Sequence, residues 1–399
     1  MSLIAGGVFM KIRLAQEADR RGVYEAMGYC FNNDLNSIEN NIKNGDYNKH
    51  EQFVVALNDK EEVISTFAVI PFNMYFEGNV IRFGGIGGVS SLPEHRGEGN
   101  ISSMFEFSLK YMKDNNMIFS ALGPFAFQFY RKMGYEWCYT WQLVSIPIND
   151  LKSFPAAPIY RELKEANAKE FNDFRNEVIS KMNGPVVRDE RLSKEKWDQY
   201  KNSRSHVYAA CNEKNEILAA MVYHQEGREI KVSELYFKEE IGRQYLLNFL
   251  YRHRSMTDSV ELIITTDDEV RNILPTPRIK YWHWAYMQGR IVVVEDFLNL
   301  IKIEDDFIGS FTIKVNDALA SWNNKTFEVE SVNNKLCVKE STKEADFEIS
   351  IQRLSQVAIG HLSGKEALKL NLVKVNNLSK TKLFEKAFSK RTTMLWQAF

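Results

Sequence analysis

Residues 87–137 read GGVSSLPEHRGEGNISSMFEFSLKYMKDNNMIFSALGPFAFQFYRKMGYEW, and they contain the clearest pattern of the chain. A β-type run ends at Leu92-Pro93, a turn with Gly97 and Gly99 follows, and apolar residues then recur at helical spacing. A glycine-containing turn between a strand and a helix directs backbone N–H groups at one spot, where the helix dipole favours an anion. The stretch therefore predicts a phosphate-binding turn, with Tyr130 placed downstream of it.

Composition narrows the class of protein. The 399 residues predict two or three domains, and a hydrophobic share of 44% is ample for packed cores. Lys+Arg number 51 and Asp+Glu 52, and this balance argues against binding to nucleic acid or to an anionic membrane. No apolar run approaches the ~18 residues that span a bilayer. Four scattered cysteines without a C-x-x-C motif predict buried thiols in a reducing cytoplasm, with no disulfide framework and no metal site.

A first domain is expected over residues 1–150. Residues 1–10 lack the basic start of a signal peptide, and Met10 is a second candidate start of the chain. The apolar spacing predicts strands at 11–14, 53–57, 63–70, 80–89 and 117–122, and helices at 16–31 and 101–112. Strands around a strand–turn–helix unit predict an α/β layer.

A second domain, residues 151–287, is expected to repeat this order after the linker Pro155–Pro158. It should contain a helix at Arg161–Met182, strands at 206–211, 217–223 and 230–235, and a helix at 241–253. A shift of 143 residues places Val89 on Val232 and Gly99 on Gly242, which favours an internal duplication.

The two copies differ at the turn. Arg96-Gly97 of the first copy lies opposite Glu239-Glu240 of the second. Two carboxylates suit a helix N-terminus, but they would repel a pyrophosphate. The second copy is therefore interpreted as a structural relic of a phosphate-binding unit.

A third domain is expected over residues 288–399. Short strands are predicted at 291–294, 311–315, 327–329, 336–338 and 347–351, and helices at 352–361, 365–370 and 382–389. The alternation in Tyr281–Tyr286 suits a half-buried strand better than a stacking site. The last residue is Phe399, and an aromatic terminus indicates a tail that is held down.

With these residues in hand, the chain resembles the GNAT acetyltransferases, and more narrowly the Eis-like (enhanced intracellular survival) proteins. The motifs that carry the resemblance are Val89-x-Ser91-Leu92-Pro93-x-His95-Arg96-Gly97-x-Gly99, Phe129-Tyr130-x-x-x-Gly134-Tyr135 and the terminal phenylalanine. The resemblance implies two tandem GNAT domains, mixed sheets flanked by helices, and a C-terminal sterol-carrier-protein-2-like α+β domain that completes the active site. General GNAT chains carry R/Q-x-x-G-x-G/A, whereas this motif ends in Ile101.

The resemblance also implies an activity. It implies acetyl-CoA as donor, direct transfer of acetyl to a primary amine, and a homo-hexamer. Tyr130 becomes the general acid and the Phe399 carboxylate the general base. The implied coenzyme contacts are Val89, Ser91, Arg96, Gly97, Gly99 and Asn100. The implied acceptors are aminoglycoside-, polyamine- or lysine-like amines.

Elementary chemistry is compatible with these roles, and each has a plainer alternative. A tyrosine hydroxyl stays protonated at neutral pH and can protonate a departing thiolate; the alternative for Tyr130 is packing at a helix edge. An α-carboxylate is a weak base unless burial raises its pKa; the alternative for Phe399 is a strand that closes a sheet. Arg96 suits a pyrophosphate, or is a solvated arginine of a capping turn. The run ending at Val89–Ser91 could donate an N–H to the thioester oxygen.

Acceptor-site residues are harder to identify. Asp34 could attract a cationic amine, although a solvated loop carboxylate is an equal alternative. Phe31, Tyr75, Phe76 and Phe83 could wall the acceptor pocket, with core packing as the default for each. Ala398 stands where some relatives have an acidic residue, which weakens the expectation of aminoglycoside selectivity.

Two other classes of function stay open at this point. The chain could be a non-catalytic CoA- or lipid-binding protein, although a carrier needs neither the Arg96 turn nor Tyr130. It could also be an aminoacyl-tRNA-dependent transferase, but such an enzyme needs a broad basic face, and the net charge is -1.

Overall fold

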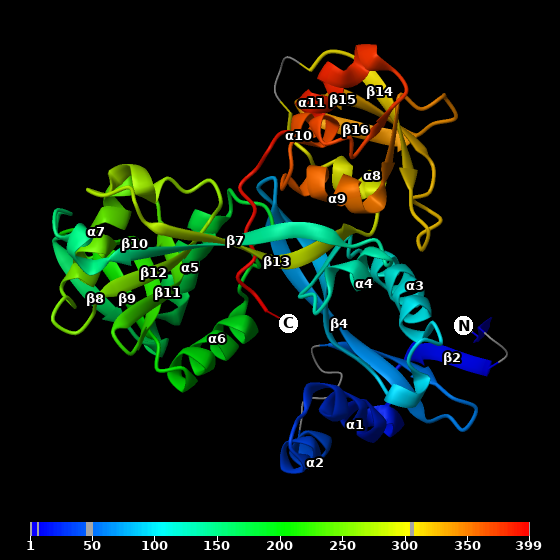
Figure 1. The fold of residues 1–399 in the computed structure, drawn as a ribbon, viewed down its shortest axis with the longest axis horizontal. Coiled ribbons are helices and arrows are strands. Elements are labelled where there is room, and N and C mark those ends of the chain that lie inside the picture. The colour runs from blue at the N-terminus through cyan, green and yellow to red at the C-terminus, as the bar shows by residue number, and fades with distance from the viewer. Residues whose placement is uncertain (1, 6–7, 45–50, 304–306, 399) are drawn as a thin grey trace.

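A computed structural model describes residues 2–5, 8–44, 51–303 and 307–398. Figure 1 shows three bodies: a first unit in blue and cyan, a second in green, and a C-terminal domain in yellow to red. The architecture is mixed α/β, as the sequence predicts.

The first unit surrounds strands β2 to β6 with helices on both faces. Side chains alternate along β3, so that Val54 packs with α3 on one face and Val55 packs with α1 on the other. Its elements are β1 (Ser2–Ala5), β2 (Val8–Leu14), η1 (Glu17–Asp19), α1 (Arg20–Phe31), α2 (Leu35–Asn44), β3 (Gln52–Leu57), β4 (Val63–Phe76), β5 (Asn79–Ser91), η2 (Pro93–His95), α3 (Asn100–Asp114), β6 (Phe119–Leu122), α4 (Phe127–Arg131) and β7 (Glu136–Pro147).

The second unit repeats this order, in agreement with the predicted duplication. Its elements are η3 (Ile148–Leu151), β8 (Ile159–Leu163), η4 (Glu165–Asn167), α5 (Ala168–Ile179), α6 (Glu190–Asn202), β9 (His206–Cys211), β10 (Ile217–Glu226), β11 (Glu229–Phe237), α7 (Glu240–Tyr251), β12 (Ser259–Ile264), η5 (Val270–Ile273) and β13 (Lys280–Ile291). Parallel pairing of β11 with β12 corresponds to parallel pairing of β5 with β6.

The two units exchange their last strands. Among the described residues, one sheet of 13 strands has the order β1-β2-β3-β4-β5-β6-β13-β7-β12-β11-β10-β9-β8. Strand β13 therefore lies between β6 and β7 of the first unit, while β7 pairs with β12 of the second. Figure 1 shows β7 and β13 crossing together from one unit to the other. The predicted boundary between residues 287 and 288 falls inside β13.

The C-terminal domain has a five-stranded sheet in the order β16-β15-β14-β17-β18, covered by short helices. Its elements are α8 (Val294–Leu298), β14 (Ser310–Asn316), β15 (Thr326–Val332), β16 (Lys335–Glu340), β17 (Phe347–Ser350), α9 (Ile351–Ile359), α10 (Gly364–Lys369), β18 (Lys374–Val375), η6 (Leu378–Lys380) and α11 (Thr381–Ala387).

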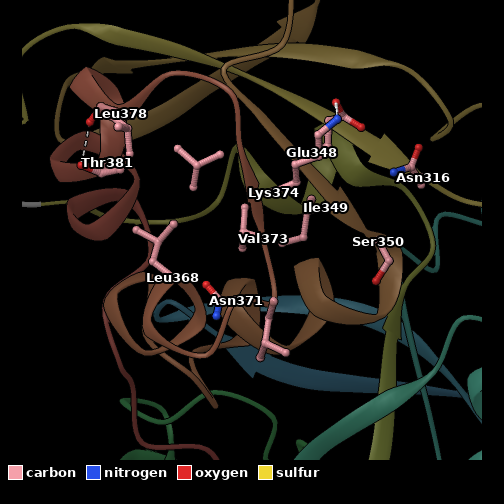
Figure 2. Close-up of a pocket in the computed structure, with 12 residues that line it drawn as sticks. Asn316, Glu348, Ile349, Ser350, Leu368, Asn371, Val373, Lys374, Leu378 and Thr381 are labelled. Carbon is pink, nitrogen blue, oxygen red and sulfur yellow. Dashed lines mark hydrogen bonds and ion pairs between the residues drawn. The ribbon is translucent and has the colours of Figure 1, made fainter.

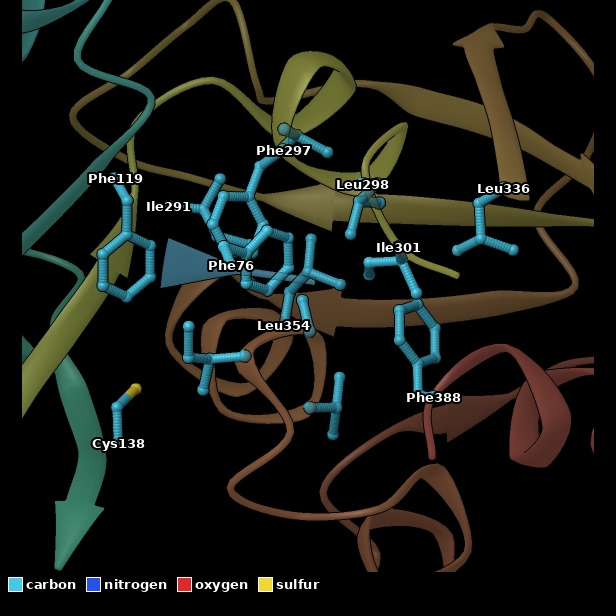
Figure 3. Packing of buried hydrophobic residues seen from close by; sticks show 14 of the residues in the cluster. Phe76, Phe119, Cys138, Ile291, Phe297, Leu298, Ile301, Leu336, Leu354 and Phe388 are labelled. Atoms are coloured by element: carbon cyan, nitrogen blue, oxygen red, sulfur yellow. The ribbon is translucent and has the colours of Figure 1, made fainter. Parts of the chain in front are cut away.

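One apolar core joins the first unit to the C-terminal domain (Figure 3). Phe297 of α8 stacks on Phe76 with ring centroids 4.2 Å apart, and on Phe119 at 5.2 Å. All three side chains are buried. Because this contact is apolar and extensive, the C-terminal domain is part of the first unit's folding core rather than a tethered module.

Two predicted elements are wrong. The helix expected from Arg161 begins only at Ala168, because Ile159–Leu163 forms strand β8 and pairs with β9. The strand expected at residues 291–294 is the end of β13 followed by the start of α8. At Ile159–Leu163, pairing with the distant strand β9 overrides the local spacing.

Candidate active site

The main cavity of the first unit has a volume of about 830 Å³ and opens where β5 separates from β6. The two strands pair only from Phe83 to Ile86 on β5 and from Phe119 to Leu122 on β6. Beyond Ile86 the edge of β5 is free of β6 and lines the cavity. The lining residues are Cys30, Phe31, Ile86, Gly87, Gly88, Val89, Ser90, Ser91, His95, Arg96, Gly97, Gly99, Asn100, Ile101, Ser102, Gly123, Phe125, Phe129, Tyr130, Lys132 and Met133.

A β-bulge shapes the free edge of β5. Thr66 pairs with Ser90 and Ala68 pairs with Gly87, so that Gly88 and Val89 lie opposite the single residue Phe67. Gly88 has φ +66°, a conformation that glycine adopts without strain. A bulge leaves its extra residue unpaired and turns the strand. The backbone at Val89 is therefore available to a ligand in the cavity.

The predicted glycine turn forms the wall at the start of α3. Gly97 has φ +87° and Gly99 has φ +84°, and Gly99 is the N-cap of α3. A Cβ at either glycine would meet no other protein atom within 4 Å, so the backbone conformation, not packing, requires glycine here. The first N–H groups of a helix have no intrahelical acceptor and carry a partial positive charge. This wall therefore fits an anion.

Arg96 and Asn100 differ in what they offer to a ligand. The Arg96 guanidinium is exposed, and its Nε donates to the Ser91 carbonyl at 3.1 Å. The Asn100 side chain is buried, and its Nδ2 donates to the His95 carbonyl at 3.2 Å and to Glu98 Oε2 at 3.3 Å. Arg96 can therefore reach a ligand with its side chain, whereas Asn100 holds the turn in shape.

Tyr130 lies in the last turn of α4 and lines the same cavity as the glycine turn. Its side chain is only 2% exposed, and its ring packs edge-on against Phe105, Phe125 and Phe129. Burial raises the pKa of the Tyr130 hydroxyl well above its ordinary value, so the hydroxyl carries its proton at neutral pH. The site therefore combines a wall whose N–H groups fit an anion with a buried tyrosine hydroxyl that keeps its proton.

The residues expected at the acceptor site are not gathered in one place. Phe31 is 54% exposed and lines the cavity, whereas Asp34 is exposed and accepts from the Ser37 backbone and hydroxyl. Phe83 is fully buried in the core, which is its default assignment. Phe76 lies in the same core, and Tyr75 packs partly buried against the second unit.

Phe399 lies outside the described residues, but the tail before it is well anchored. Asn183 N donates to the Thr392 carbonyl at 2.9 Å, and Trp141 Nε1 donates to the Leu395 carbonyl at 3.0 Å. Trp396 is buried with its ring against Tyr236. The tail therefore lies between the two units.

The start of α7 shows how the second copy differs. Glu239 is the N-cap of α7, and Arg243 pairs with Glu240 and with Asp268 at 2.5 Å each. Acidic side chains thus lie at the N-terminus of α7, whereas the N-terminus of α3 in the first copy offers N–H groups to an anion. This difference agrees with the interpretation of the second copy as a structural relic of a phosphate-binding unit.

Several cavity residues were missed by sequence reasoning, among them Cys30, Phe125 and Gly88. Cys30 lies within 3.8 Å of the Arg96 guanidinium, Phe125 is 73% exposed at the cavity, and Gly88 forms the bulge. Only Gly88 had a signal, because the adjacent glycines Gly87-Gly88 end a β-type run. Cys30 and Phe125 come from other elements and are joined to the site only by folding.

Comparison with known families gives the assignment. Residues 11–138 and residues 184–291 each match an acetyltransferase (GNAT) domain, and residues 294–396 match a sterol carrier protein domain. The protein is an acetyltransferase of the GNAT fold. The expected order of two such domains and a sterol-carrier-like domain is confirmed.

Solved structures show the same overall fold. Over 98% of its length, this acetyltransferase is similar to a protein of unknown function from Enterococcus faecalis V583 described as a probable N-acyltransferase (21% identity, TM-score 0.88). It is also similar over 98% of its length to a GCN5-related N-acetyltransferase from Anabaena variabilis ATCC 29413 (18% identity, TM-score 0.86) and to Eis1 from Mycobacterium abscessus (16% identity, TM-score 0.80). Each of these solved chains is covered over 100% of its length. A search of curated proteins gave no match.

In the described ranges, every helix is too short or too polar to cross a bilayer. Within the same residues, no group of three or more His, Cys, Asp or Glu side chains could hold a metal ion.

Proposed function

We propose that this acetyltransferase moves an acetyl group from acetyl-CoA to a primary amine, and that it does so at the cavity of the first unit and not at the corresponding turn of the second. One observation supports this most directly: the glycine turn, the free edge of β5 and Tyr130 line one cavity. The second unit has Glu239 and Glu240 at the corresponding turn, which disfavours a pyrophosphate there.

Residues of the first unit would hold the coenzyme. The N–H groups around Gly97 and Gly99, with Arg96, would bind the pyrophosphate, while Val89 and Ser91 would pair with the pantetheine arm. Asn100 would act by keeping the turn closed. When bound, acetyl-CoA supplies the thioester whose acetyl group is transferred.

Tyr130 is assigned the role of general acid. The amine nitrogen forms a bond to the acetyl carbon as the carbon–sulfur bond breaks, and the thiolate then takes a proton from the Tyr130 hydroxyl. Low polarity around Tyr130 raises the pKa of its hydroxyl, and the same surroundings make a thiolate more basic. A backbone N–H of the β5 bulge would meet the charge that develops on the acetyl oxygen.

The Phe399 carboxylate is assigned the role of general base that removes the amine proton. Support comes from the anchored tail, because Leu395 and Trp396 are buried between the two units. The C-terminal domain would thus complete the site.

Several finer assignments follow the Eis-like resemblance. We propose a cytoplasmic homo-hexamer that acts on aminoglycoside-, polyamine- or lysine-like amines. Phe31 at the cavity and the exposed Asp34 would contact the acceptor. Ala398 supplies no negative charge beside the terminus, which favours acceptors that need only one carboxylate partner.

The deciding experiment is thiol release from acetyl-CoA over a panel of amines, with wild type and Tyr130→Phe. We expect kcat to fall by roughly 10²–10³-fold in the variant, while the Kd for CoA changes less than about twofold. The control is Tyr29→Phe, which alters an exposed tyrosine. Full turnover of Tyr130→Phe would reject the general-acid role, and absence of CoA binding by wild type would reject the enzyme itself.

A second experiment concerns Phe399. One glycine added after Phe399, or amidation of the terminus, should lower kcat by at least ~10²-fold and leave the Kd for CoA unchanged. A glycine inserted in the exposed turn at Gly227 serves as the length control. Wild-type turnover of the extended chain would exclude the carboxylate as base.

A second candidate function belongs to the C-terminal domain. Its match to a sterol carrier protein domain coincides with a cavity of about 810 Å³, shown in Figure 2. Leu368, Val373 and Leu378 give it an apolar wall, and Asn371 and Lys374 give it a polar one. Extraction of lipids from purified protein tests this function, and a lipid-free protein that binds no fluorescent fatty acid would reject it.

A further inference from the structure

Helix α9 of the C-terminal domain holds the segment that follows Tyr130. Gln352 Nε2 donates to the Arg131 carbonyl at 2.9 Å, and Gln356 Nε2 donates to the Trp137 carbonyl at 2.7 Å. The first bond is to the residue next to Tyr130, and the second is to the start of β7. Side chains of one helix thus tie both ends of the α4–β7 turn, which comprises residues 131–137.

A buried charge strengthens this contact. The Glu136 carboxylate is only 1% exposed and binds Arg131 from its own turn at 2.8 Å. Arg353 of α9 reaches the same carboxylate at 3.1 Å and also donates to Gln356 Oε1 at 2.7 Å. Because charge-assisted bonds in a buried place are strong, the carboxylate links the turn to α9 with little freedom.

The centre of the turn is fixed from a third side. The buried Arg290 of β13 donates to the Met133 carbonyl and to both oxygens of Asp317, at 2.8 and 2.6 Å. Asp317 belongs to the C-terminal domain. Gly134 has φ +87°, and a Cβ there would collide with the Arg290 guanidinium. The turn therefore packs tightly against the Arg290 side chain.

These contacts fix the turn that is hydrogen-bonded to Tyr130, and the position of Tyr130 matters for catalysis. Met133 N and Tyr135 N donate to the Tyr130 carbonyl at 2.9 and 3.1 Å, so the turn and Tyr130 move as one piece. A displacement of about 1 Å of a catalytic group can lower turnover by ~10²-fold. Helix α9 belongs to the C-terminal domain, and no described residue of that domain lines the cavity.

We propose that Gln352, Arg353 and Gln356 are positioning residues that set the placement of the Tyr130 hydroxyl, so that the sterol-carrier-like domain acts on catalysis through α9. The proposal rests on the general-acid role of Tyr130. It gives this domain a function in acetyl transfer that is separate from the Phe399 terminus and from any lipid in its own cavity.

A double-mutant cycle tests the proposal on the full-length protein. Gln352→Ala should lower kcat by roughly tenfold and leave the KM for acetyl-CoA within about twofold. In the Tyr130→Phe background the same substitution should change kcat by less than about twofold, because the group it positions is gone. Arg353→Gln should behave in the same way, and both side chains are partly exposed, which favours folding of the variants.

Lys339→Gln is the matched control. It removes an exposed ion pair with Glu330 in the same domain, away from the turn, and should leave kcat unchanged in both backgrounds. An equal fall caused by Gln352→Ala in both backgrounds, or no fall in either, overturns the positioning role. Full turnover of Tyr130→Phe alone overturns the proposed function together with it, and the two failures are thereby distinguished.

Discussion

At Gly134, both the backbone conformation and the lack of space exclude any side chain larger than that of glycine. Gly134→Ala should destabilise the protein by roughly 3 kcal/mol, because a left-handed φ and a collision with buried Arg290 act together. Gly227→Ala also imposes a positive φ, but its Cβ meets no atom within 4 Å, and it should cost about 1 kcal/mol. Urea unfolding midpoints measure both. Equal losses would mean that Arg290 moves aside.

The proposed binding of the coenzyme pyrophosphate depends more on Arg96 than on any other side chain. Arg96→Ala should weaken CoA binding by roughly 10–100-fold, since a charge-assisted bond contributes about 1.5–3 kcal/mol. The kcat at saturating acetyl-CoA should change little. Arg254→Ala, which alters an arginine of the second unit, is the control. Titration calorimetry at two salt concentrations measures the effect, and unchanged affinity would identify Arg96 as a solvated arginine of the turn.

At the residue scale, the sequence predicted those site residues that belong to one short motif. The glycine turn is encoded within a few residues, and Gly97, Gly99 and Tyr130 do line one cavity. The acceptor aromatics were less predictable, because Phe31 and Phe83 have the same side chain and differ only in the surface that the fold leaves over them. Burial of that kind depends on distant partners.

The loop after α9 makes stability depend on pH. Burial lowers the pKa of His361 to about 4, with a smaller contribution from Lys390, and its ring packs on Trp137. The unfolded chain binds a proton near pH 6.5 and the folded protein does not, so stability should fall as the pH drops from about 6.5 to about 4. The slope from this group is at most about 1.4 kcal/mol per pH unit.

His361→Gln should flatten that dependence. Urea unfolding from pH 4 to pH 7 measures the slope, and His283→Gln, which changes an exposed histidine, is the control. If His361→Gln keeps the wild-type slope, other groups are responsible for it.

Helices and strands were predicted well where the apolar spacing within the segment itself identifies them. Strand β9 (His206–Cys211) has the predicted bounds, and α3 and α7 lie within two residues of theirs. Strand β8 was mistaken for the start of a helix, because Ile159–Leu163 is short and polar enough to suit either state. Its pairing with β9 decides between them, and that pairing is absent from local sequence.

At the scale of the whole molecule, the strand exchange predicts that the first unit cannot stand alone. A fragment of residues 1–278 lacks β13, which separates β6 from β7, and lacks the C-terminal half of the core around Phe297. We expect this fragment to aggregate and to bind no CoA. Co-expression with residues 279–399 should restore both solubility and binding, as pull-down on CoA resin would show. A soluble fragment that binds CoA alone would contradict the prediction.

The exchange itself could not be predicted from the sequence. The duplication indicates two similar sheets, and nothing in the alternation of β7 or β13 says which sheet each one enters. Such a choice depends on contacts between residues more than a hundred positions apart. The order of domains, by contrast, follows from the motifs and is confirmed.

The place of β13 also has a consequence for synthesis on the ribosome. Strand β6 leaves the ribosome about 170 residues before the part of β13 that pairs with it, a delay of roughly 10–30 s at ordinary elongation rates. During this interval the edge of β6, beside the future cavity, has no partner and is open to chance pairing with other nascent chains. The sheet of the first unit therefore stays incomplete until almost three quarters of the polypeptide has emerged.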